Sequence, residues 1–433
     1  MISIGYVLSS VIAILTLGII ISEKYHRTPV AFMGAMVMMV AGSVGHFYSF
    51  DVALASIDLK TLALLFGSMI LVVILEETGF FQYVGIYTAK ATRGNPWSLL
   101  VGLGALTGIL SMFLNNVTTV MLIAPIAITV ARILELSPIP YLMSAAIMAN
   151  VGGVGTLVGH PPNVLIGYAA GIGFNNFFMH AFPVALISGV FTLFSMKLIY
   201  RTELRKRPEH IEALMLMDPH DAIVNKKIAR TGVLVLITVI MLFFLQDVSG
   251  LDAAVVSLCG AAILLILVDP KRDPQHILAR TEVSLLLFFT SLFVIFGALR
   301  ATGVLDSVAH LLLNHAEANL LLTAVIILWV SAVLSALIDN IPLAVAMIPI
   351  IQNLDHSGVP VMILWWALIF GVGFGGHGSP IGSAANLVAI AHSEQTDTPI
   401  TLRVWLRSGL SSMLICLLVA TLGLVIYGVY GLA

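Results

Sequence analysis

The sequence carries little charge. Asp, Glu, Lys and Arg make up 10% of its 433 residues, and the formal net charge is −2. Soluble globular proteins contain about 25% charged residues, so this chain lacks the polar side chains that would cover a surface facing water. The near-neutral balance also provides no basic surface for a polyanion. These absences exclude a soluble globular protein and argue against a nucleic-acid partner.

Cysteine is almost absent. Cys259 and Cys416 are the only two, and each lies in an apolar stretch of its own. They form no CxxC motif, no disulfide framework and no thiolate cluster, and we predict no cofactor and no metal centre. GxSxG and HExxH motifs are also missing. An intramembrane hydrolase built on His377 and Ser379 is therefore disfavoured, and the chain is not predicted to be an enzyme.

Long hydrophobic runs are abundant. Hydrophobic residues make up 59% of the chain, and the mean hydropathy is +1.06. Many runs reach the ~20 residues that a helix needs to cross a bilayer, and the alternating ~10-residue segments of a β-barrel are not seen. We predict an all-α polytopic membrane protein with about ten full spans, near 4–22, 28–45, 60–76, 118–134, 178–200, 230–246, 252–268, 282–299, 341–354 and 407–431. The first run reaches spanning length without a positive n-region, so it is not predicted to be a cleaved signal.

Two pairs of stretches repeat along the chain in the same order. The first pair is MFLNNVTTVMLIAP (Met112–Pro125) and ALIDNIPLAVAMIP (Ala336–Pro349). The second pair is GGVGTLVGHPPN (Gly152–Asn163) and GGHGSPIGSAAN (Gly375–Asn386). The spacing within the second pair is one residue shorter than within the first, so the register is almost constant. We interpret the chain as the product of a duplication, with its polar interruptions in corresponding places.

The positive charges orient the two repeats. The segment Lys197–Arg230 holds eight of the twenty Lys and Arg residues, and positive charge marks the cytoplasmic side. The same side is predicted for Lys24, Arg27, Lys271, Arg272, Arg280, Arg403 and Arg407, whereas the loops 43–50, 172–177 and 247–252 contain no Lys or Arg. We predict a multi-pass protein of the cell inner membrane with both termini outside. It consists of a first repeat (1–200), a cytoplasmic linker (201–229) and a second repeat of inverted topology (230–433).

Glycine and proline interrupt the apolar sequence in each repeat. Between Gly152 and Pro162 there are four glycines and two prolines, which cost ~1 and ~3 kcal/mol each inside a helix. Non-helical backbone at membrane depth survives only when it is buried in protein or lines a wet cavity. We therefore predict broken helices at 141–172 and 360–392, each facing a re-entrant hairpin, at 97–115 and 319–339. The half-helices after the breaks should present free N–H groups and a positive dipole end.

The polar side chains of these tips and breaks form the predicted site. The substrate-binding candidates are amides and hydroxyls: Asn115, Asn116, Thr118, Thr119, Thr156, Asn163, Asn340, Ser379, Ser383 and Asn386. Proton or cation coupling is assigned to Asp339, the single acid among them, and to His160 and His377, which titrate near physiological pH. Open alternatives are helix packing for the glycines, helix capping for the amides and for Asp339, and buried polar packing for the histidines.

FLNNVTTVMLIAP, GTLVGHPPN and IDNIPLAVAMIP resemble the ion transporter superfamily. The similarity is greatest to ArsB-type arsenite permeases and to bacterial relatives of the P protein, with NhaD-type sodium–proton antiporters as further relatives. The resemblance covers nearly the whole chain. It implies a scaffold domain, a transport domain of two hairpins and two broken helices, elevator-like alternating access, and export of arsenite and antimonite in exchange for protons. It also implies a soluble ATPase partner for some members.

Residue chemistry favours one substrate class of that superfamily. The four breaks contain no Arg or Lys, and desolvating a dicarboxylate without a cation is costly. A neutral trihydroxide of arsenic or antimony needs only amide and hydroxyl partners. Sodium–dicarboxylate relatives carry Ser-Asn-Thr at the tips, where this chain has Asn115-Asn116-Val117 and Asp339-Asn340-Ile341, and the P-protein pattern has Asp in place of His160.

The sequence therefore predicts a transporter that exports arsenite and antimonite in exchange for protons. A sodium–proton antiporter and a sodium-coupled anion or dicarboxylate transporter remain the alternatives. The partners expected are the lipid bilayer, the small inorganic substrate and protons, and a homodimer stays open.

Overall fold

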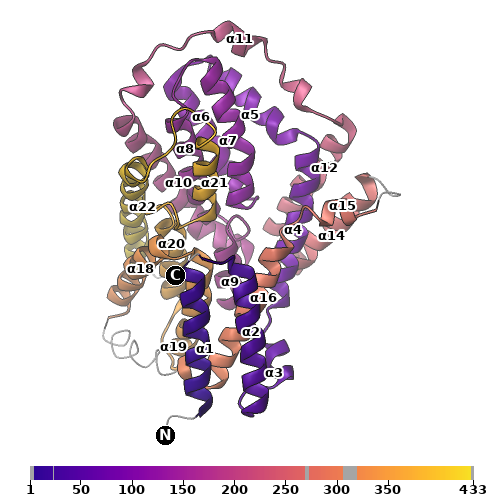
Figure 1. The fold of residues 1–433 in the computed structure, drawn as a ribbon, viewed down its shortest axis with the longest axis vertical. Coiled ribbons are helices and arrows are strands. Elements are labelled where there is room, and N and C mark those ends of the chain that lie inside the picture. Colours follow the sequence, from indigo (N-terminus) through magenta and orange to yellow (C-terminus); the bar gives the residue numbers. More distant parts are fainter. Residues whose placement is uncertain (1–3, 23, 269–272, 306–318, 431–433) are drawn as a thin grey trace.

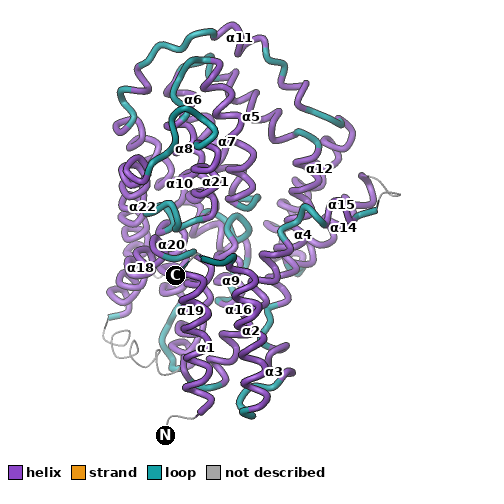
Figure 2. The backbone as a smooth tube through the Cα atoms, in the orientation of Figure 1, coloured by secondary structure: helices purple, strands orange, loops and turns teal. Residues whose placement is uncertain are grey.

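The structure is a computed structural model that describes residues 4–22, 24–268, 273–305 and 319–430. Throughout these residues the chain forms helices and loops and no strand (Figure 2), which confirms the all-α prediction. The first half contains α1 (Ile4–Ile21), α2 (Arg27–Val44), α3 (Phe50–Ala55), α4 (Leu59–Glu77), α5 (Phe80–Ala91), α6 (Pro96–Ser111), α7 (Asn116–Ile133), α8 (Ile139–Val154), α9 (Pro161–Ala169) and α10 (Phe174–Ile199).

The second half repeats this order. It contains α12 (Lys226–Phe244), α13 (Gln246–Ser249), α14 (Ala253–Val268), α15 (Gln275–Leu278), α16 (Val283–Ala301), α18 (Leu320–Leu337), α19 (Asn340–His356), α20 (Met362–Gly375), α21 (Ala384–Ser393) and α22 (Leu402–Tyr430). Helices α4, α6, α7, α8 and α9 and their described counterparts α16, α18, α19, α20 and α21 start at the same spacing to within one residue. Lys271 and Arg272, two of the cations predicted on the cytoplasmic side, lie outside the described residues, as do both chain ends.

Eight described helices are long and apolar enough to cross a membrane: α2, α4, α7, α10, α12, α16, α18 and α22. Seven of them coincide with predicted spans. The predicted spans 4–22 and 252–268 correspond to shorter apolar helices, and 341–354 is α19. The sequence predicts the eighth helix, α18, as a hairpin arm, and length and hydropathy alone do not distinguish such an arm from a full span.

Corresponding helices of the two halves make corresponding contacts. Helix α4 packs on α14 and α2 packs on α16, and α6 packs on α8 as α18 packs on α20. Each hairpin also crosses to the other half, since α7 packs on α21 and α19 packs on α9. In Figure 1, α1 and α2 fill the lower part of the molecule and α5 to α8 the upper part. The crossed pairs bring both hairpins to both breaks.

The linker is tied to the first half. It contains two short 3-10 helices, η1 (Glu203–Arg205) and η2 (Pro219–Ala222), and α11 (Ile211–Leu216), and it arches over α5 and α6 (Figure 1). The Val224 N–H donates to the Thr78 carbonyl at 3.0 Å, and the Lys90 ammonium donates to the Met217 carbonyl at 2.5 Å. These contacts place the second half of the linker next to the C-terminal ends of α4 and α5.

Local sequence explains where the hairpins begin and turn. Asn95 caps α6 by accepting the Ser98 N–H at 3.0 Å, and Pro96 occupies the first position of that helix, where an N–H is not needed. Asn319 caps α18 by accepting the Leu322 N–H at 2.9 Å. Both hairpins thus start at an asparagine cap and turn at a second capped position, Asn115 or Asp339.

Each hairpin packs against its broken helix where the backbones approach closely. A methyl group on Gly152 in α8 would overlap with the backbone of Gly108 in α6. In the second half, a methyl group on Gly375 would lie 2.5 Å from the carbonyl oxygen of Ala332. Because both obstacles are backbone atoms, they cannot move aside as a side chain can. Glycine is therefore required at both positions for helix packing.

We expect the substitution Gly152→Ala to lower stability by about 1–3 kcal/mol, the usual cost of overpacking. Gly18→Ala in α1 is the matched control, because no atom lies within 4 Å of the added methyl group, and helix propensity favours alanine there by up to ~1 kcal/mol. Thermal unfolding of both purified variants in detergent measures the difference. Equal midpoints for the two variants would contradict the close approach of α6 and α8.

Candidate functional site

The two hairpin tips and the two breaks converge on one small cavity. This tip cavity has a volume of about 30 Å³, close to the share of one water molecule in the liquid. Of the predicted site residues, it is lined by Asn115, Asn116, His160, Asp339, Asn340 and Ser383. The structure therefore brings together residues of both repeats, in a form closed around the site.

The tip asparagines each reach into the break of the other half. The Asn116 amide donates to the Ser383 hydroxyl at 3.3 Å, and the Asn340 amide lies 3.3 Å from Nε2 of His160. Ser383 occupies in the second break the position that His160 occupies in the first, so the two contacts are equivalent. The duplicated scaffold thus places a hydroxyl at one position and an imidazole at the other.

Asn150 belongs to a hydrogen-bond network around Asn116, and the second half has no equivalent of this asparagine. Its side-chain oxygen accepts from the Asn116 amide at 2.8 Å and from the Ser383 hydroxyl at 2.9 Å, and its amide donates to Asn386 at 2.9 Å. The equivalent position in the second half is Gly373. The sequence prediction missed Asn150, although a lone asparagine within the apolar helix α8 was a visible signal. This network joins the first tip to both broken helices through buried side chains.

Four of the predicted site residues form hydrogen bonds with the backbone in and beside the breaks. Two of these four have hydroxyl side chains. The Thr156 hydroxyl donates to the Met112 carbonyl, and the Ser379 hydroxyl donates to the Ala336 carbonyl at 2.5 Å. Each also accepts a backbone N–H of its own break at 3.1 Å. These hydroxyls therefore fasten each break to the hairpin beside it.

The amides of Asn163 and Asn386 satisfy the unwound carbonyls in the same way. Asn163 donates to the carbonyls of Gly153 and Thr156, both at 2.9 Å. Asn386 donates to those of Gly376 and Ser379, at 2.7 and 2.9 Å. In the structure all four side chains contact the protein's own backbone, so their present role is bracing.

The remaining tip residues divide between capping and cavity lining. Asn115 caps α7 by accepting the Val117 N–H at 3.1 Å, as Asp339 caps α19 by accepting the Ile341 N–H at 3.2 Å. Thr119 donates to the Asn115 carbonyl at 3.0 Å within its own helix and is fully buried. Thr118 lines a larger neighbouring cavity.

The two histidines have different surroundings. His160 lines the tip cavity. Among the residues that the structure describes, Nδ1 of His160, Oδ1 of buried Asn163 and Nε2 of His377 have no hydrogen-bond partner. His377 lies away from that cavity. Its Nδ1 is 3.4 Å from the Ser412 hydroxyl, and its carbonyl accepts from the Trp405 indole at 3.1 Å. Of the two, only His160 lines the tip cavity.

Charged groups reach the tips from helices outside the breaks. Arg27, the first residue of α2, forms a salt bridge with Asp339 and lies 5.4 Å from the ring centroid of Phe288. Glu282, which precedes α16, accepts a hydrogen bond from the Asn115 amide at 3.3 Å. The predicted inventory of one acid and no cation was therefore incomplete, because it considered only the breaks.

The two half-helices after the breaks differ in the backbone N–H groups that they can donate. Helix α9 begins with Pro161 and Pro162, which have no N–H, and the next N–H, of Asn163, donates to the His160 carbonyl at 2.9 Å. Helix α21 begins with Ala384 and Ala385, which keep their N–H groups. The expectation of free N–H donors at both half-helices is thus wrong for α9, for a reason present in its sequence.

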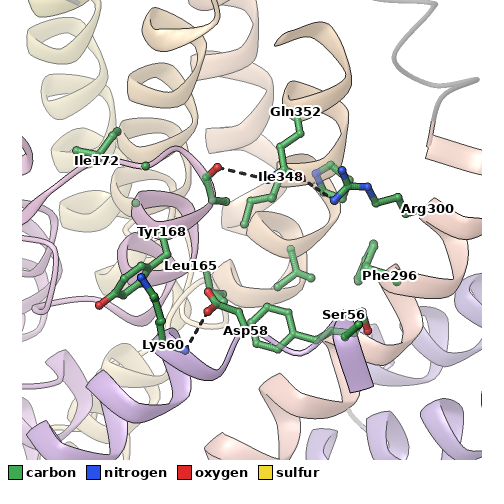
Figure 3. A pocket seen from close by; sticks show the side chains of 18 of the residues that line it. Ser56, Asp58, Lys60, Leu165, Tyr168, Ile172, Phe296, Arg300, Ile348 and Gln352 are labelled. Carbon is green, nitrogen blue, oxygen red and sulfur yellow. Dashed lines mark hydrogen bonds between the residues drawn. The ribbon is translucent and has the colours of Figure 1, made fainter. Parts of the chain in front are cut away.

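Two larger cavities flank the tips at opposite ends of α4 and α16. The Lys60 cavity, about 540 Å³, is lined by the start of α4, with Lys60, and by the end of α16, with Phe296 and Arg300 (Figure 3). The Lys60 ammonium pairs with Asp252 at 2.9 Å. The Thr118 cavity, about 370 Å³, is lined by the end of α4 and by Glu282. It shares Asn115, Pro161 and Glu282 with the tip cavity. The site therefore has a cavity on either side.

A protein-family model described as the CitMHS citrate transporter matches residues 17–371. The chain belongs to this family. A "46 kDa membrane protein" of Mycobacterium leprae is 33% identical over 422 residues, covering 96% of this chain and 97% of the relative. An "Uncharacterized transporter" of Mycobacterium tuberculosis is 34% identical over 397 residues, covering 90% of this chain and 91% of the relative. The human P protein is 33% identical over 92% of this chain, which spans 57% of the P protein.

The fold has a solved counterpart. The YdaH transporter of Alcanivorax borkumensis superimposes with a TM-score of 0.60 over 99% of this chain and 98% of its own, at 14% sequence identity. Together with the eight candidate spans, these comparisons identify a multi-pass membrane transporter of the citrate transporter family, within the ion transporter superfamily. An ArsB-type specificity stays a prediction.

We expect Asn150→Ala to destabilise the protein by about 2 kcal/mol or more, because it removes the acceptor of the buried Ser383 hydroxyl and the donor to Oδ1 of buried Asn386, each at ~1–3 kcal/mol. Asn176→Ala, at an exposed position of α10, is the control and should be nearly neutral. Chemical or thermal unfolding of both variants measures the cost. A neutral Asn150→Ala would show that the network does not hold the two halves together.

Proposed function

We propose that this transporter exports the neutral hydroxides of arsenic(III) and antimony(III) in exchange for protons. The observation that carries the proposal is the make-up of the tip cavity. Asn116, Asn340, Ser383 and His160 line it with amide, hydroxyl and imidazole groups, and its charged residues are Arg27, Asp339 and Glu282. A neutral trihydroxide exchanges hydrogen bonds with such groups without the desolvation cost of an ion.

The charge of the site supports a neutral substrate. Arg27 supplies one positive charge and already pairs with Asp339, while Glu282 adds a second negative charge. A free citrate trianion would therefore enter a cavity whose ionised groups are negative in sum. Burying such an anion without compensating cations is strongly unfavourable.

The size of the cavity supports a small substrate. Sites for molecules of drug size enclose about 300–1,000 Å³, whereas the tip cavity encloses about 30 Å³. Any solute requires the tips to separate, and a trihydroxide requires less separation than a tricarboxylate. The Lys60 and Thr118 cavities, at opposite ends of α4 and α16, provide the two vestibules that alternating access needs.

A carboxylate is the second candidate, favoured by Arg27 and by the description of the family. Guanidinium groups bind carboxylates in a bidentate manner, and the N–H groups at the start of α21 suit an anion. Because Arg27 is engaged by Asp339, this candidate requires the salt bridge to open, or the carboxylate to arrive complexed with a metal cation that reduces its charge.

We expect Asn116→Ala and Asn340→Ala each to abolish arsenite resistance conferred on a sensitive host. Each substitution removes cross-repeat hydrogen bonds at the cavity, which corresponds to binding weaker by about tenfold or more, since ~1.4 kcal/mol is tenfold in affinity. Growth in arsenite, with membrane expression measured by immunoblot, tests this. Asn176→Ala is the control. Unchanged resistance in both tip variants would remove the tips from the binding site.

Ligand-dependent thermal stabilisation separates the two candidates. A ligand that binds only the native state raises the unfolding midpoint, by ~2.7 kcal/mol of stability at one hundred times its dissociation constant. The purified protein is heated with arsenite, antimonite, citrate, citrate with Mg²⁺, succinate or sodium. Stabilisation by arsenite or antimonite supports the proposal, and stabilisation by citrate or its metal complex alone would replace it with the second candidate.

A further inference from the structure

The residues that precede α4 and α16 occupy equivalent positions in the two repeats but form different hydrogen bonds. Asp58 in the first repeat corresponds to Glu282 in the second, and each is the N-cap residue of its helix. Asp58 accepts the backbone N–H groups of Lys60 and Thr61 at 3.1 and 3.3 Å and the Thr61 hydroxyl at 2.5 Å. Glu282 forms no capping hydrogen bond with α16. Its carboxylate is therefore free of the structural duty that occupies Asp58.

The Glu282 carboxylate contacts the tip of the first hairpin instead. The Asn115 amide donates to its Oε2 at 3.3 Å, and the Thr118 hydroxyl also donates to it. Glutamate is one methylene longer than aspartate, so the carboxylate extends past the start of α16 to α7. Asn115 caps α7 and precedes the site residue Asn116. A change in the charge of Glu282 thus acts directly on the backbone turn that positions Asn116.

Glu282 lies between the site and a larger cavity. It lines both the tip cavity and the Thr118 cavity. The Thr118 cavity extends to Arg280, whose side chain is 42% exposed and pairs with Glu76 at 3.1 Å. A proton therefore has a short route from the protein surface to Glu282, and from Glu282 to the tips.

The surrounding charges leave Glu282 available for a proton. Arg27 of α2 forms its salt bridge with Asp339 at the start of α19, and Arg280 forms its salt bridges with Glu76 and Glu77 of α4. Within the described residues Glu282 has amide and hydroxyl donors but no salt bridge. The other titratable groups of the tip cavity are His160, which precedes α9, and the paired Arg27 and Asp339.

We propose that Glu282 is the proton-binding group that couples transport to the proton gradient. This inference rests on the proposed proton exchange. As a carboxylate, Glu282 holds the Asn115 tip by charge-assisted hydrogen bonds. When Oε2 takes a proton from water of the Thr118 cavity, the charge is lost, these hydrogen bonds weaken, and the tip is released from the start of α16. Release of the proton to water restores the contact. Asp339, paired with Arg27 and capping α19, is instead a structural counter-ion.

The test compares Glu282 with Asp58, the carboxylate at the equivalent position of the first repeat. Wild type, Glu282→Gln and the control Asp58→Asn are reconstituted in proteoliposomes, with arsenite as the probe. Arsenite exchange at equal pH on both sides measures binding and movement, and arsenite flux driven by a pH gradient measures coupling. We expect Glu282→Gln to retain exchange at equal pH and to lose the stimulation by the gradient, whereas Asp58→Asn keeps the wild-type ratio of the two rates.

Glu282→Asp provides a second variant in case the glutamine variant does not fold. The shorter side chain should cap α16 as Asp58 caps α4 and lose contact with Asn115, so gradient stimulation should again be lost. A gradient response equal to that of the wild type in either Glu282 variant would overturn the assignment. So would loss of stimulation in Asp58→Asn to the same extent.

A spectroscopic measurement separates this inference from the choice of substrate. If the wild type moves no arsenite, the proposed substrate fails, but protonation is still observable in infrared difference spectra between alkaline and acidic buffer. We expect a protonated-carboxyl band in the wild type and in Asp58→Asn that is missing from Glu282→Gln. An unchanged band in Glu282→Gln would show that another group binds the proton.

Discussion

Unwound backbone inside an apolar protein must find its hydrogen bonds within the chain, because lipid offers none. This constraint shapes the centre of the molecule. Each break is held by an asparagine from the half-helix that follows it and by a hydroxyl that fastens it to the adjacent hairpin. The same devices occur in both halves at corresponding positions of the repeat. Each break is thereby hydrogen-bonded to the hairpin beside it by the chain's own side chains.

The two copies differ at residues in and beside the tip cavity. The bracing residues are duplicated, but His160 corresponds to Ser383, Asn115 corresponds to Asp339, and Asn150 has Gly373 as its counterpart. Each difference changes a hydrogen-bonding or charged group at or beside the tip cavity while leaving the backbone unaltered. Around Asn116 the amides form a closed network. Within the described part of the chain, Nδ1 of His160 and Oδ1 of Asn163 in the first break have no hydrogen-bond partner, and neither does Nε2 of His377 in the second break. Unsatisfied buried polar groups are costly unless a ligand or water completes them.

The sequence predicted much of this arrangement because the relevant signals are local. Glycine and proline at Gly152–Pro162 break a helix wherever it lies, and a repeat can be recognised by its spacing alone. Asn116 and Asn340 were found in this way. Arg27, Asn150 and Glu282 were not, because their importance depends on packing between distant segments. In the sequence, Arg27 cannot be distinguished from any other cation at the end of a span. Only the packing of α2 places it against Asp339 in the other half of the chain. The two prolines at the start of α9 are visible in the sequence, and because proline has no N–H they remove the backbone donors that were predicted there.

The duplication also explains how one copy of a structural residue could acquire a separate function. An N-cap contributes about 1 kcal/mol, so a helix as long and as apolar as α16 retains its place without one. Lengthening that cap by one methylene, from the Asp58 type to Glu282, removes a modest local stabilisation and places a carboxylate against the opposite half of the protein. The hydrogen bond lost at the helix start is exchanged for one at the hairpin tip. The Glu282 carboxylate contacts the hairpin tip, whereas the capping carboxylate of Asp58 contacts its own helix.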